Sequence, residues 1–216
     1  MLKGKKILLT VGPTREFLDP VRFITNESSG KMGFAIAEEL QKENVELVII
    51  SGPVNIHLKV PEENIKKVST ALEMYEACQK HFSKVDIAIF TAAVADYRPK
   101  HQATSKIKKD GDIAMVEFVK NPDIAAEFGK IKLPHQISVG FALETDNVIE
   151  NAQKKLTKKG FDMIVINSPN PGEGFGYDTN KVLIHIKGQN IQDYPLKPKS
   201  EVARDIVDKI KLLIDK

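Results

Sequence analysis

The segment Asn26-Glu27-Ser28-Ser29-Gly30-Lys31-Met32-Gly33 connects two regular patterns, a short apolar run at Lys6–Val11 and a helical pattern at Met32–Glu43. The apolar run, followed by Gly12, is typical of a buried strand. Backbone N–H groups at a helix N-terminus have no intrahelical partner, and the helix dipole adds partial positive charge there. A strand, a loop of small residues and a helix in this order therefore predict a phosphate site, formed by Gly12, Ser28, Ser29 and Gly30.

Strands and helices continue to alternate along the rest of the chain. Further buried strands are predicted at Glu46–Ser51, Val85–Thr91, Gln136–Phe141, Asp162–Asn167 and Lys181–Ile186, with helices at Ala71–Phe82, Asn147–Lys159 and from Ser200 onward. This alternation predicts an α/β fold, with a doubly wound, mostly parallel, Rossmann-like sheet and helices on both faces. The length of 216 residues suits a single domain, 1–216.

Two segments interrupt the alternation. Asp110-Gly111 lies between the extended runs Ile107–Lys109 and Ile113–Val119, which is a strong hairpin signal. We therefore expect a β-hairpin flap at about 97–120 that projects from the carboxyl edge of the sheet, with Lys106 and Lys108 on one face. These lysines are either an ordinary charged outer face or an arm that brings ammonium groups onto a triphosphate. A loop rich in Pro, Gly and Asn at 168–172 is expected to be mobile.

Composition excludes several classes of protein. The net charge of +3 does not indicate a nucleic-acid binder, which usually has a clustered basic surface. The single cysteine, Cys78, excludes an internal disulfide framework and fits a reducing compartment. No run is long and apolar enough to cross a membrane, and Ile7–Leu9 is too short for a signal peptide. We expect a cytoplasmic protein, with Cys78 packed in the core.

The two common phosphate-loop motifs are absent. The first turn has one glycine where a dinucleotide fingerprint has three, and the second strand ends in Ser51-Gly52 without a ribose-binding acid. A Walker A loop would need glycine at Thr25 and Ser or Thr at Met32. A simple helix cap at Ser28–Gly30 therefore stays open as the alternative to a ligand site.

Other polar groups also have structural alternatives. Asn121-Pro122-Asp123 predicts a helix start, with Asn121 as N-cap. The free N–H groups of Asp123, Ile124 and Ala125 in this first turn are either satisfied by ordinary capping or face a ligand. Lys155 and Lys159 share a helix face and can simply complement the dipole. Arg15, Glu16, Asp19 and Arg22 are expected to form a structural ion-pair cluster, and the five histidines show no metal-ligand spacing.

Taken together, these motifs resemble the phosphopantothenate–cysteine ligase (phosphopantothenoylcysteine synthetase) family of coenzyme A biosynthesis. The resemblance extends over essentially the whole chain and rests on Gly12–Glu16, Asp19–Arg22, Asn26, Ser28–Gly33, Ala92–Asp96, Lys106–Lys109, Asn121–Asp123, Gly140–Ala142, Glu144-Thr145 and Asn167. In many bacteria this domain follows a flavin-dependent decarboxylase domain. That domain is missing from this sequence, so the chain looks like the stand-alone form, with a separate phosphopantothenoylcysteine decarboxylase acting next.

The resemblance implies a homodimeric ligase that joins 4′-phosphopantothenate to L-cysteine. The Ala92–Asp96 stretch and the lysine flap look like the bacterial type, which uses CTP and Mg²⁺ and forms an acyl-cytidylate, rather than the eukaryotic type that favours ATP. Asn26 matches the residue that holds the acyl group, and Lys106 matches the flap lysine over the reacting centre. The implied nucleotide site comprises Phe90, Thr91, Ala92, Asp96, Lys106, Pro122, Asp123, Ile124, Ala125, Phe141, Lys155 and Lys159. No protein ligand to Mg²⁺ and no base for the cysteine amine can be named.

Two other functions remain as alternatives. The doubly wound pattern is also typical of an NAD(P)-dependent reductase, although the glycine fingerprint and the ribose acid are missing. The chain could also be a non-catalytic nucleotide-binding scaffold. Nicotinamide titration tests the first, and pyrophosphate release from CTP that depends on phosphopantothenate and Mg²⁺ tests the second.

Overall fold

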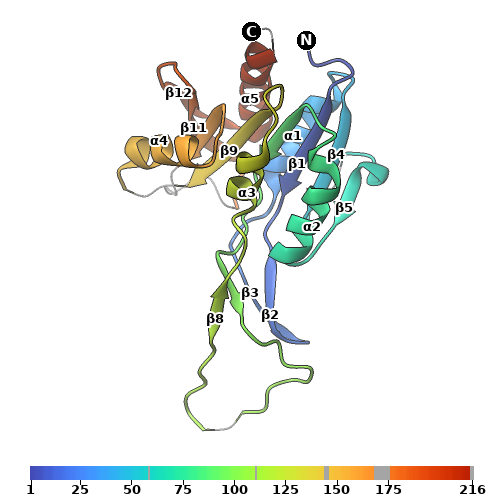
Figure 1. Cartoon of the computed structure of the whole chain (residues 1–216), viewed down its shortest axis with the longest axis vertical. Coiled ribbons are helices and arrows are strands. Elements are labelled where there is room, and N and C mark those ends of the chain that lie inside the picture. The colour runs from blue at the N-terminus through green and yellow to red at the C-terminus, as the bar shows by residue number, and fades with distance from the viewer. Residues whose placement is uncertain (58, 110, 144–145, 168–175, 215–216) are drawn as a thin grey trace.

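The computed structural model describes residues 1–57, 59–109, 111–143, 146–167 and 176–214, so the expected loop at 168–172 and Asp110 lie outside the described residues. A central sheet carries helices on both faces, and a long arm projects from one of its edges (Figure 1). The N-terminus and the end of the last helix lie on the opposite side of the sheet from the arm. The predicted fold class is confirmed.

The sheet has eight strands in the order β12-β11-β10-β9-β6-β1-β4-β5. The six strands from β10 to β5 in this order run parallel to one another, and β11 pairs antiparallel with both β10 and β12. Their bounds are β1 (Lys6–Val11), β4 (Glu46–Ser51), β5 (Ile65–Lys67), β6 (Ile87–Phe90), β9 (Ile137–Leu143), β10 (Met163–Asn167), β11 (Thr179–Ile186) and β12 (Gln192–Pro198). The sequence did not predict β5 and β12, since β5 is very short and β12 contains two prolines, which are tolerated at the sheet edge.

The helices are α1 (Lys31–Gln41), α2 (Ala71–Phe82), α3 (Ile124–Ile131), α4 (Val148–Lys158) and α5 (Lys199–Ile214), with a short 3₁₀ helix at Glu62–Asn64. Two apolar cores form, one on each face of the sheet. Ile7, Leu9 and Val11 of β1 pack into the core beneath α1 and α5, whereas Leu8 packs into the core beneath α2, α3 and α4. The continuous apolar run of β1 follows from this coverage of both faces.

The chain reverses direction across the sheet at β1. From β1 it moves outward to β4 and β5, then returns to β6 on the other side of β1. Connections at the carboxyl ends of β1 and β6 therefore diverge, and such a switch point leaves a crevice where ligands bind in doubly wound sheets. Gly12 and Thr91, which follow these two strands, lie at this crevice.

The arm contains two short hairpin pairings, one more than the sequence predicted. Strand β2 (Arg15–Asp19) pairs with β3 (Arg22–Thr25), and β7 (Tyr97–Pro99) pairs with β8 (Phe118–Lys120). The expected β-hairpin flap at about 97–120 is confirmed by the antiparallel pairing of β7 with β8. The expected strand pairing directly across Asp110-Gly111 is wrong, because the described residues between Pro99 and Phe118 form no strand. The Lys106 segment is held by β2 and β3, since the N–H of Ala103 donates to the carbonyl of Leu18 in β2 at 2.9 Å and Nη2 of Arg22 in β3 donates to the carbonyl of Ile107 at 2.7 Å.

Candidate functional site

The first turn of α1 forms one wall of a cavity at the carboxyl edge of the sheet, which we call the α1 cavity. Its volume is about 150 Å³. Its lining comprises residues 28–33, 91–93 and 141–143 together with Asn167, Asn180 and Lys199. The predicted loop residues Ser28, Ser29 and Gly30 and the predicted nucleotide residue Thr91 are therefore in the lining. The cavity lies at the switch-point crevice between β1 and β6.

Glycine is required where the loop before α1 crosses the loop after β1. Gly30 and Gly12 have backbone φ values of 75° and 76°, which residues other than glycine rarely adopt. A Cβ at Gly30 would lie 2.7 Å from Cγ1 of Val54 and 3.4 Å from Cα of Gly12. Gly12 is thus packed directly behind Gly30 and shapes the loop from behind.

The N–H groups at the start of α1 have only weak protein partners. The N-cap, Gly30, has no side-chain capping bond. The hydroxyls of Ser28 and Ser29 accept from the N–H groups of Gly30 and Lys31 at 3.4 and 3.5 Å, which is the long limit for such bonds. This geometry favours a ligand site at the helix N-terminus over the simple cap, since an anion in the cavity could replace these contacts.

A second cavity of about 160 Å³ adjoins the first, and Ala92 and Phe141 line both. We call it the α3 cavity, because Asn121, Pro122 and Asp123 lead from it into α3. Nine of the twelve predicted nucleotide residues line it: Phe90, Ala92, Asp96, Pro122, Asp123, Ile124, Ala125, Phe141 and Lys159. Residues far apart in the sequence are therefore gathered in one crevice.

The start of α3 differs from the prediction. Asp123, not Asn121, is the N-cap, and its Oδ1 accepts from the N–H of Ala126 at 3.1 Å. Asn121 is engaged elsewhere, because its Nδ2 donates to the carbonyl of Ala95 at 2.8 Å and its Oδ1 accepts from Nη1 of Arg98 at 3.1 Å. Asn121 thus ties the loop after β6 to the loop before α3.

Of the two predicted nucleotide lysines near the end of α4, Lys155 and Lys159, one reaches the α3 cavity. Nζ of Lys159 lies 3.0 Å from both carboxylate oxygens of Asp123, so the charge of the N-cap is balanced at the cavity wall. The helix ends at Lys158, one residue before the predicted end, and Gly160 follows the C-cap Lys159 with φ of 64°. Lys155 lies one turn earlier and does not line this cavity.

Asn26 lies at the base of the arm and bridges to the loop after β6. Its Nδ2 donates to the carbonyls of Ala93 at 3.1 Å and Val94 at 3.2 Å. Together with Ile24, Ala95, Asp96, Tyr97 and Phe118 it lines a third, open and largely apolar hollow of about 520 Å³. Because Nδ2 is engaged with these two carbonyls, Asn26 can offer a ligand its carbonyl oxygen directly and its Nδ2 by exchange.

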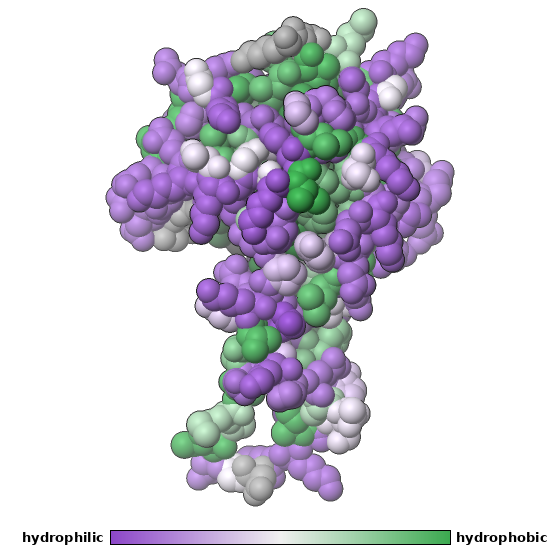
Figure 2. Space-filling view, in the orientation of Figure 1, coloured by the Kyte–Doolittle hydropathy of each residue, from purple (hydrophilic) through white to green (hydrophobic). Residues whose placement is uncertain are grey.

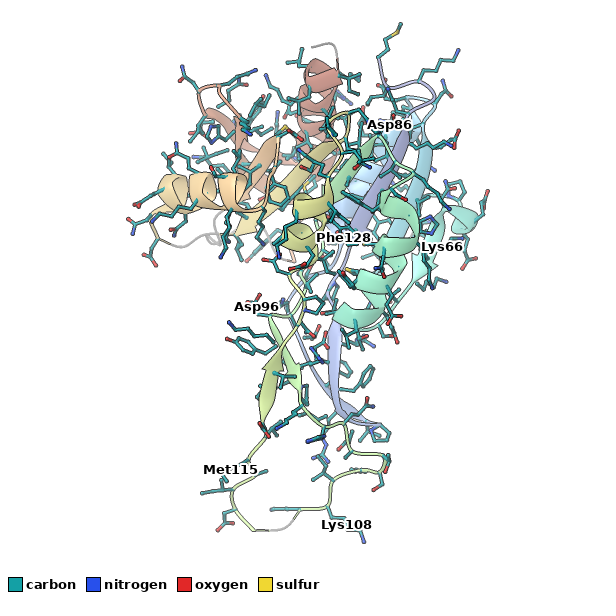
Figure 3. All side chains as sticks on the ribbon, viewed as in Figure 1. Lys66, Asp86, Asp96, Lys108, Met115 and Phe128 are labelled. Atoms are coloured by element: carbon teal, nitrogen blue, oxygen red, sulfur yellow. The ribbon has the colours of Figure 1, made fainter. Side chains whose placement is uncertain are left out.

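Lys106 is not brought to these cavities within one chain. It is exposed and lines none of the three, whereas Asp96 lies at the base of the arm and Lys108 near its tip (Figure 3). Its neighbour Ile107 is clamped through both backbone groups, since its N–H donates to Oδ2 of Asp19 at 3.1 Å and its carbonyl accepts from Nη2 of Arg22 at 2.7 Å. The β2–β3 turn therefore fixes the position of Lys106.

The expected ion-pair cluster near β2 is confirmed for one pair. Nε of Arg22 donates to Oδ2 of Asp19 at 2.8 Å. Burial would raise the pKa of Asp19, but bonds from Val21, Arg22 and Ile107 outweigh it and hold this pKa far below its usual value. The other two residues have different partners: Arg15 lies over the ring of Phe23 at 4.5 Å, and Glu16 accepts from the N–H of Ala71 at 3.0 Å.

Sequence reasoning missed two residues of the α1 cavity, Asn180 and Lys199. Two signals were present. Asn180 shares its strand face with the inward-facing Val182 and Ile184, where a polar residue is unusual. Lys199 begins α5, where the helix dipole disfavours a cation. Within the described ranges, no three His, Cys, Asp or Glu side chains gather as a metal centre, and no helix is both long and apolar enough to cross a bilayer.

Comparison with known proteins gives a consistent picture. A family model described as the DNA/pantothenate metabolism flavoprotein C-terminal domain matches residues 2–213. A Borreliella burgdorferi protein named coenzyme A biosynthesis bifunctional protein CoaBC is 45% identical over 209 residues, which are 95% of this chain and 52% of that protein. A protein from an unidentified prokaryote, named cysteine/cysteine sulfinic acid decarboxylase, is 45% identical over 214 residues, which are 99% of this chain and 60% of that protein.

A solved structure resembles this chain over its full length. The crystal structure of the C-terminal domain of a coenzyme A biosynthesis bifunctional protein CoaBC superimposes with a TM-score of 0.83 at 41% identity, covering 99% of this chain and 97% of that one. The chain therefore spans about half to three fifths of the curated relatives but nearly all of this domain.

Proposed function

Because this chain belongs to the family of the DNA/pantothenate metabolism flavoprotein C-terminal domain, we propose that it is a phosphopantothenate–cysteine ligase. In the proposed reaction, 4′-phosphopantothenate attacks the α-phosphorus of CTP and pyrophosphate leaves. The amine of L-cysteine then attacks the acyl carbon of the acyl-cytidylate, loses a proton and expels CMP. The relatives named as coenzyme A biosynthesis proteins support this assignment.

One observation carries the proposal: the α1 cavity and the α3 cavity meet at Ala92 and Phe141. The first step requires two anionic ligands whose reacting atoms are in contact, so two adjoining sites are what the chemistry needs. The α1 cavity offers helix N–H groups and lysines, which suit phosphate oxygens. The α3 cavity combines Phe90 and Phe161 with Asp96, Asn121 and Asp123, which suit a base with polar edges.

Charge accumulates on phosphoryl oxygens during the first step, so preorganised donors and cations should supply most of the catalysis. Mg²⁺ fits this arrangement, because it is usually held by substrate phosphates and one or two carboxylates. Asp96 is the cavity carboxylate suited to this role, since Asp123 is engaged with Lys159 and the N–H of Ala126. When bound, Mg²⁺ would neutralise phosphate charge.

Asn26 would orient the acyl intermediate. Its bonds fix the side chain beside Ala93, which lines the α1 cavity, and Val94, which lines the α3 cavity. In this role its neutral amide contacts the acyl group without adding charge. The other residue predicted to be catalytic, Lys106, would neutralise charge at the reacting centre.

The position of Lys106 is explained if two copies of the chain form a dimer through their arms. Apolar side chains on the arm are exposed, including Val21 at 59%, Tyr97 at 50% and Phe118 at 40% (Figure 2). Such a surface is unfavourable in an isolated chain and typical of an interface. In the proposed dimer, the arm of one chain brings Lys106 to the cavities of its partner.

The test is to offer each nucleoside triphosphate with 4′-phosphopantothenate, Mg²⁺ and L-cysteine, while measuring pyrophosphate, nucleoside monophosphate and the mass of the product. The expected result is CMP and pyrophosphate in equal amounts with phosphopantothenoylcysteine. No turnover with any triphosphate would overturn the proposal. Carbon dioxide release from cysteine or its sulfinic acid alone would point instead to the activity named for the other relative.

A further inference from the structure

The α1 cavity has a second wall, formed by Asn180 of β11 and Lys199 at the start of α5. Both side chains are buried, with 3% of Asn180 and 7% of Lys199 exposed. They line the cavity together with the first turn of α1, although they follow that turn in the sequence by more than half the chain. The C-terminal part of the chain therefore contributes polar groups to this cavity.

Lys199 occupies a position that is unfavourable for a cation on three counts. Burial lowers its pKa, and the nearby charge of Lys31 lowers this pKa further, while Asp178 acts in the opposite direction. It also lies in the first turn of α5, where the helix dipole opposes positive charge. Two lysines and two helix N-termini thus concentrate positive potential at one small cavity, which is the environment that an anion stabilises.

Asn180 supplies a second, independent observation. Among the residues that the structure describes, its buried Oδ1 has no hydrogen-bond partner, and its Nδ2 makes a 3.9 Å contact with the sulfur of Met32 in the first turn of α1. Unpaired polar groups are rare in protein interiors, because each one loses its bonds to water. A half rotation of the amide would direct Nδ2 toward an anion in the cavity.

Segment Gly176–Asp178 holds both lysines at the rim. Nζ of Lys31 donates to Oδ1 of Asp178 at 2.7 Å and to the carbonyl of Gly176 at 3.3 Å, while Nζ of Lys199 donates to the carbonyl of Tyr177 at 2.5 Å. The carboxylate of Asp178 is largely exposed, so its pair with Lys31 is weak. A phosphate entering the cavity could replace Asp178 as the partner of Lys31.

We propose that Lys199 and Asn180 bind a phosphate group opposite the N-terminus of α1, and that Lys31 exchanges from Asp178 to this group. The inference rests on the proposed function and adds residues to the same site. Two phosphates of that reaction share this chemistry, the β,γ-phosphates of the nucleotide and the 4′-phosphate of phosphopantothenate. Inorganic pyrophosphate and 4′-phosphopantothenate are therefore the two probes.

The experiment measures the affinity for each probe by isothermal titration calorimetry in four proteins: wild type, Lys199→Met, Asn180→Asp and Lys209→Gln. Lys199→Met removes the charge but keeps the apolar stem, and Asn180→Asp adds a repelling charge at nearly constant size. Lys209 lies on the same helix but not at the cavity, so it controls for net charge. Circular dichroism and the unfolding temperature report whether each variant is folded.

The expected result is a loss of about tenfold or more for one probe in both cavity variants, the scale of one hydrogen bond to a charged group, with no change in Lys209→Gln. Loss for pyrophosphate assigns the nucleotide phosphates, and loss for phosphopantothenate assigns the 4′-phosphate. Wild-type affinity for both probes in either folded variant overturns the inference, as does no binding to the wild type. Binding needs no turnover, so an inactive protein that shows these losses would refute only the ligase assignment.

Discussion

Mixing two inactive variants tests whether Lys106 acts on the partner chain. Asn26→Ala removes the amide at the base of the arm and leaves Lys106 intact, and Lys106→Ala does the reverse. Asn26 is bonded to Ala93 and Val94 beside the cavities of its own chain, whereas Lys106 is held beyond the β2–β3 turn by the clamp on Ile107. If the arm reaches across, a mixed dimer has one site with both residues intact.

The magnitude follows from the symmetry of a dimer. Random reassortment makes half of the dimers mixed, and each has one intact site of two, so the mixture should reach about a quarter of wild-type activity per chain. Each variant alone should lose roughly a hundredfold or more, on the scale of one preorganised charge-stabilising donor. If Lys106 instead acts within its own chain, every site in the mixture lacks one of the two residues.

The assay is pyrophosphate release from CTP after the two variants are unfolded together and refolded, with differently tagged chains to count mixed dimers. Refolding each variant alone gives the background, and a wild-type sample treated identically gives the recovered maximum. Activity no higher than the sum of the backgrounds, in a sample shown to contain mixed dimers, would refute action across the dimer. A light-scattering mass of one chain would refute the dimer itself.

Three further predictions concern the arm and the core. Gly33→Ala should lower the free energy of unfolding by about 1–3 kcal/mol through overpacking, because the added Cβ would lie 2.4 Å from Cγ1 of Val11. An unchanged urea midpoint would contradict this. Burial raises the pKa of Cys78 to about 12, so the thiol stays protonated below that pH. We therefore expect a thiol reagent at pH 8 to label Cys78 only when the protein unfolds. Rapid labelling of the native protein would be inconsistent with this packing. The lowered pKa of Asp19 means that its contribution to stability is present above the ordinary carboxyl pKa and is lost only as the pH falls through the lower folded value. Amide exchange at Ile107 should therefore be equally protected at pH 7 and pH 4.5 after correction for intrinsic rates, and Asp19→Asn should remove the protection at both.

The sequence by itself determined six of the eight sheet strands, the helices that cover the sheet and the loop before α1. Buried parallel strands need continuous apolar runs, and amphipathic helices repeat their apolar positions every three or four residues, so local pattern suffices for both. Phe90, Ala92, Asp96, Phe141 and Lys159 were predicted as one site from a resemblance spread over the chain, and they do line one cavity. Their roles as nucleotide ligands remain predictions.

Only the tertiary structure decided which groups share the site and where the arm lies. Asp123 caps α3 because Asn121 is already bonded to Ala95 and Arg98, a competition that helix signals cannot reveal. Lys106 is placed by long-range bonds from Asp19 and Arg22 to Ile107, so a local hairpin signal gave the wrong pairing. Asn180 and Lys199 reach the α1 cavity because α5 packs against both α1 and β11, and contacts between distant segments leave no short-range pattern in the chain.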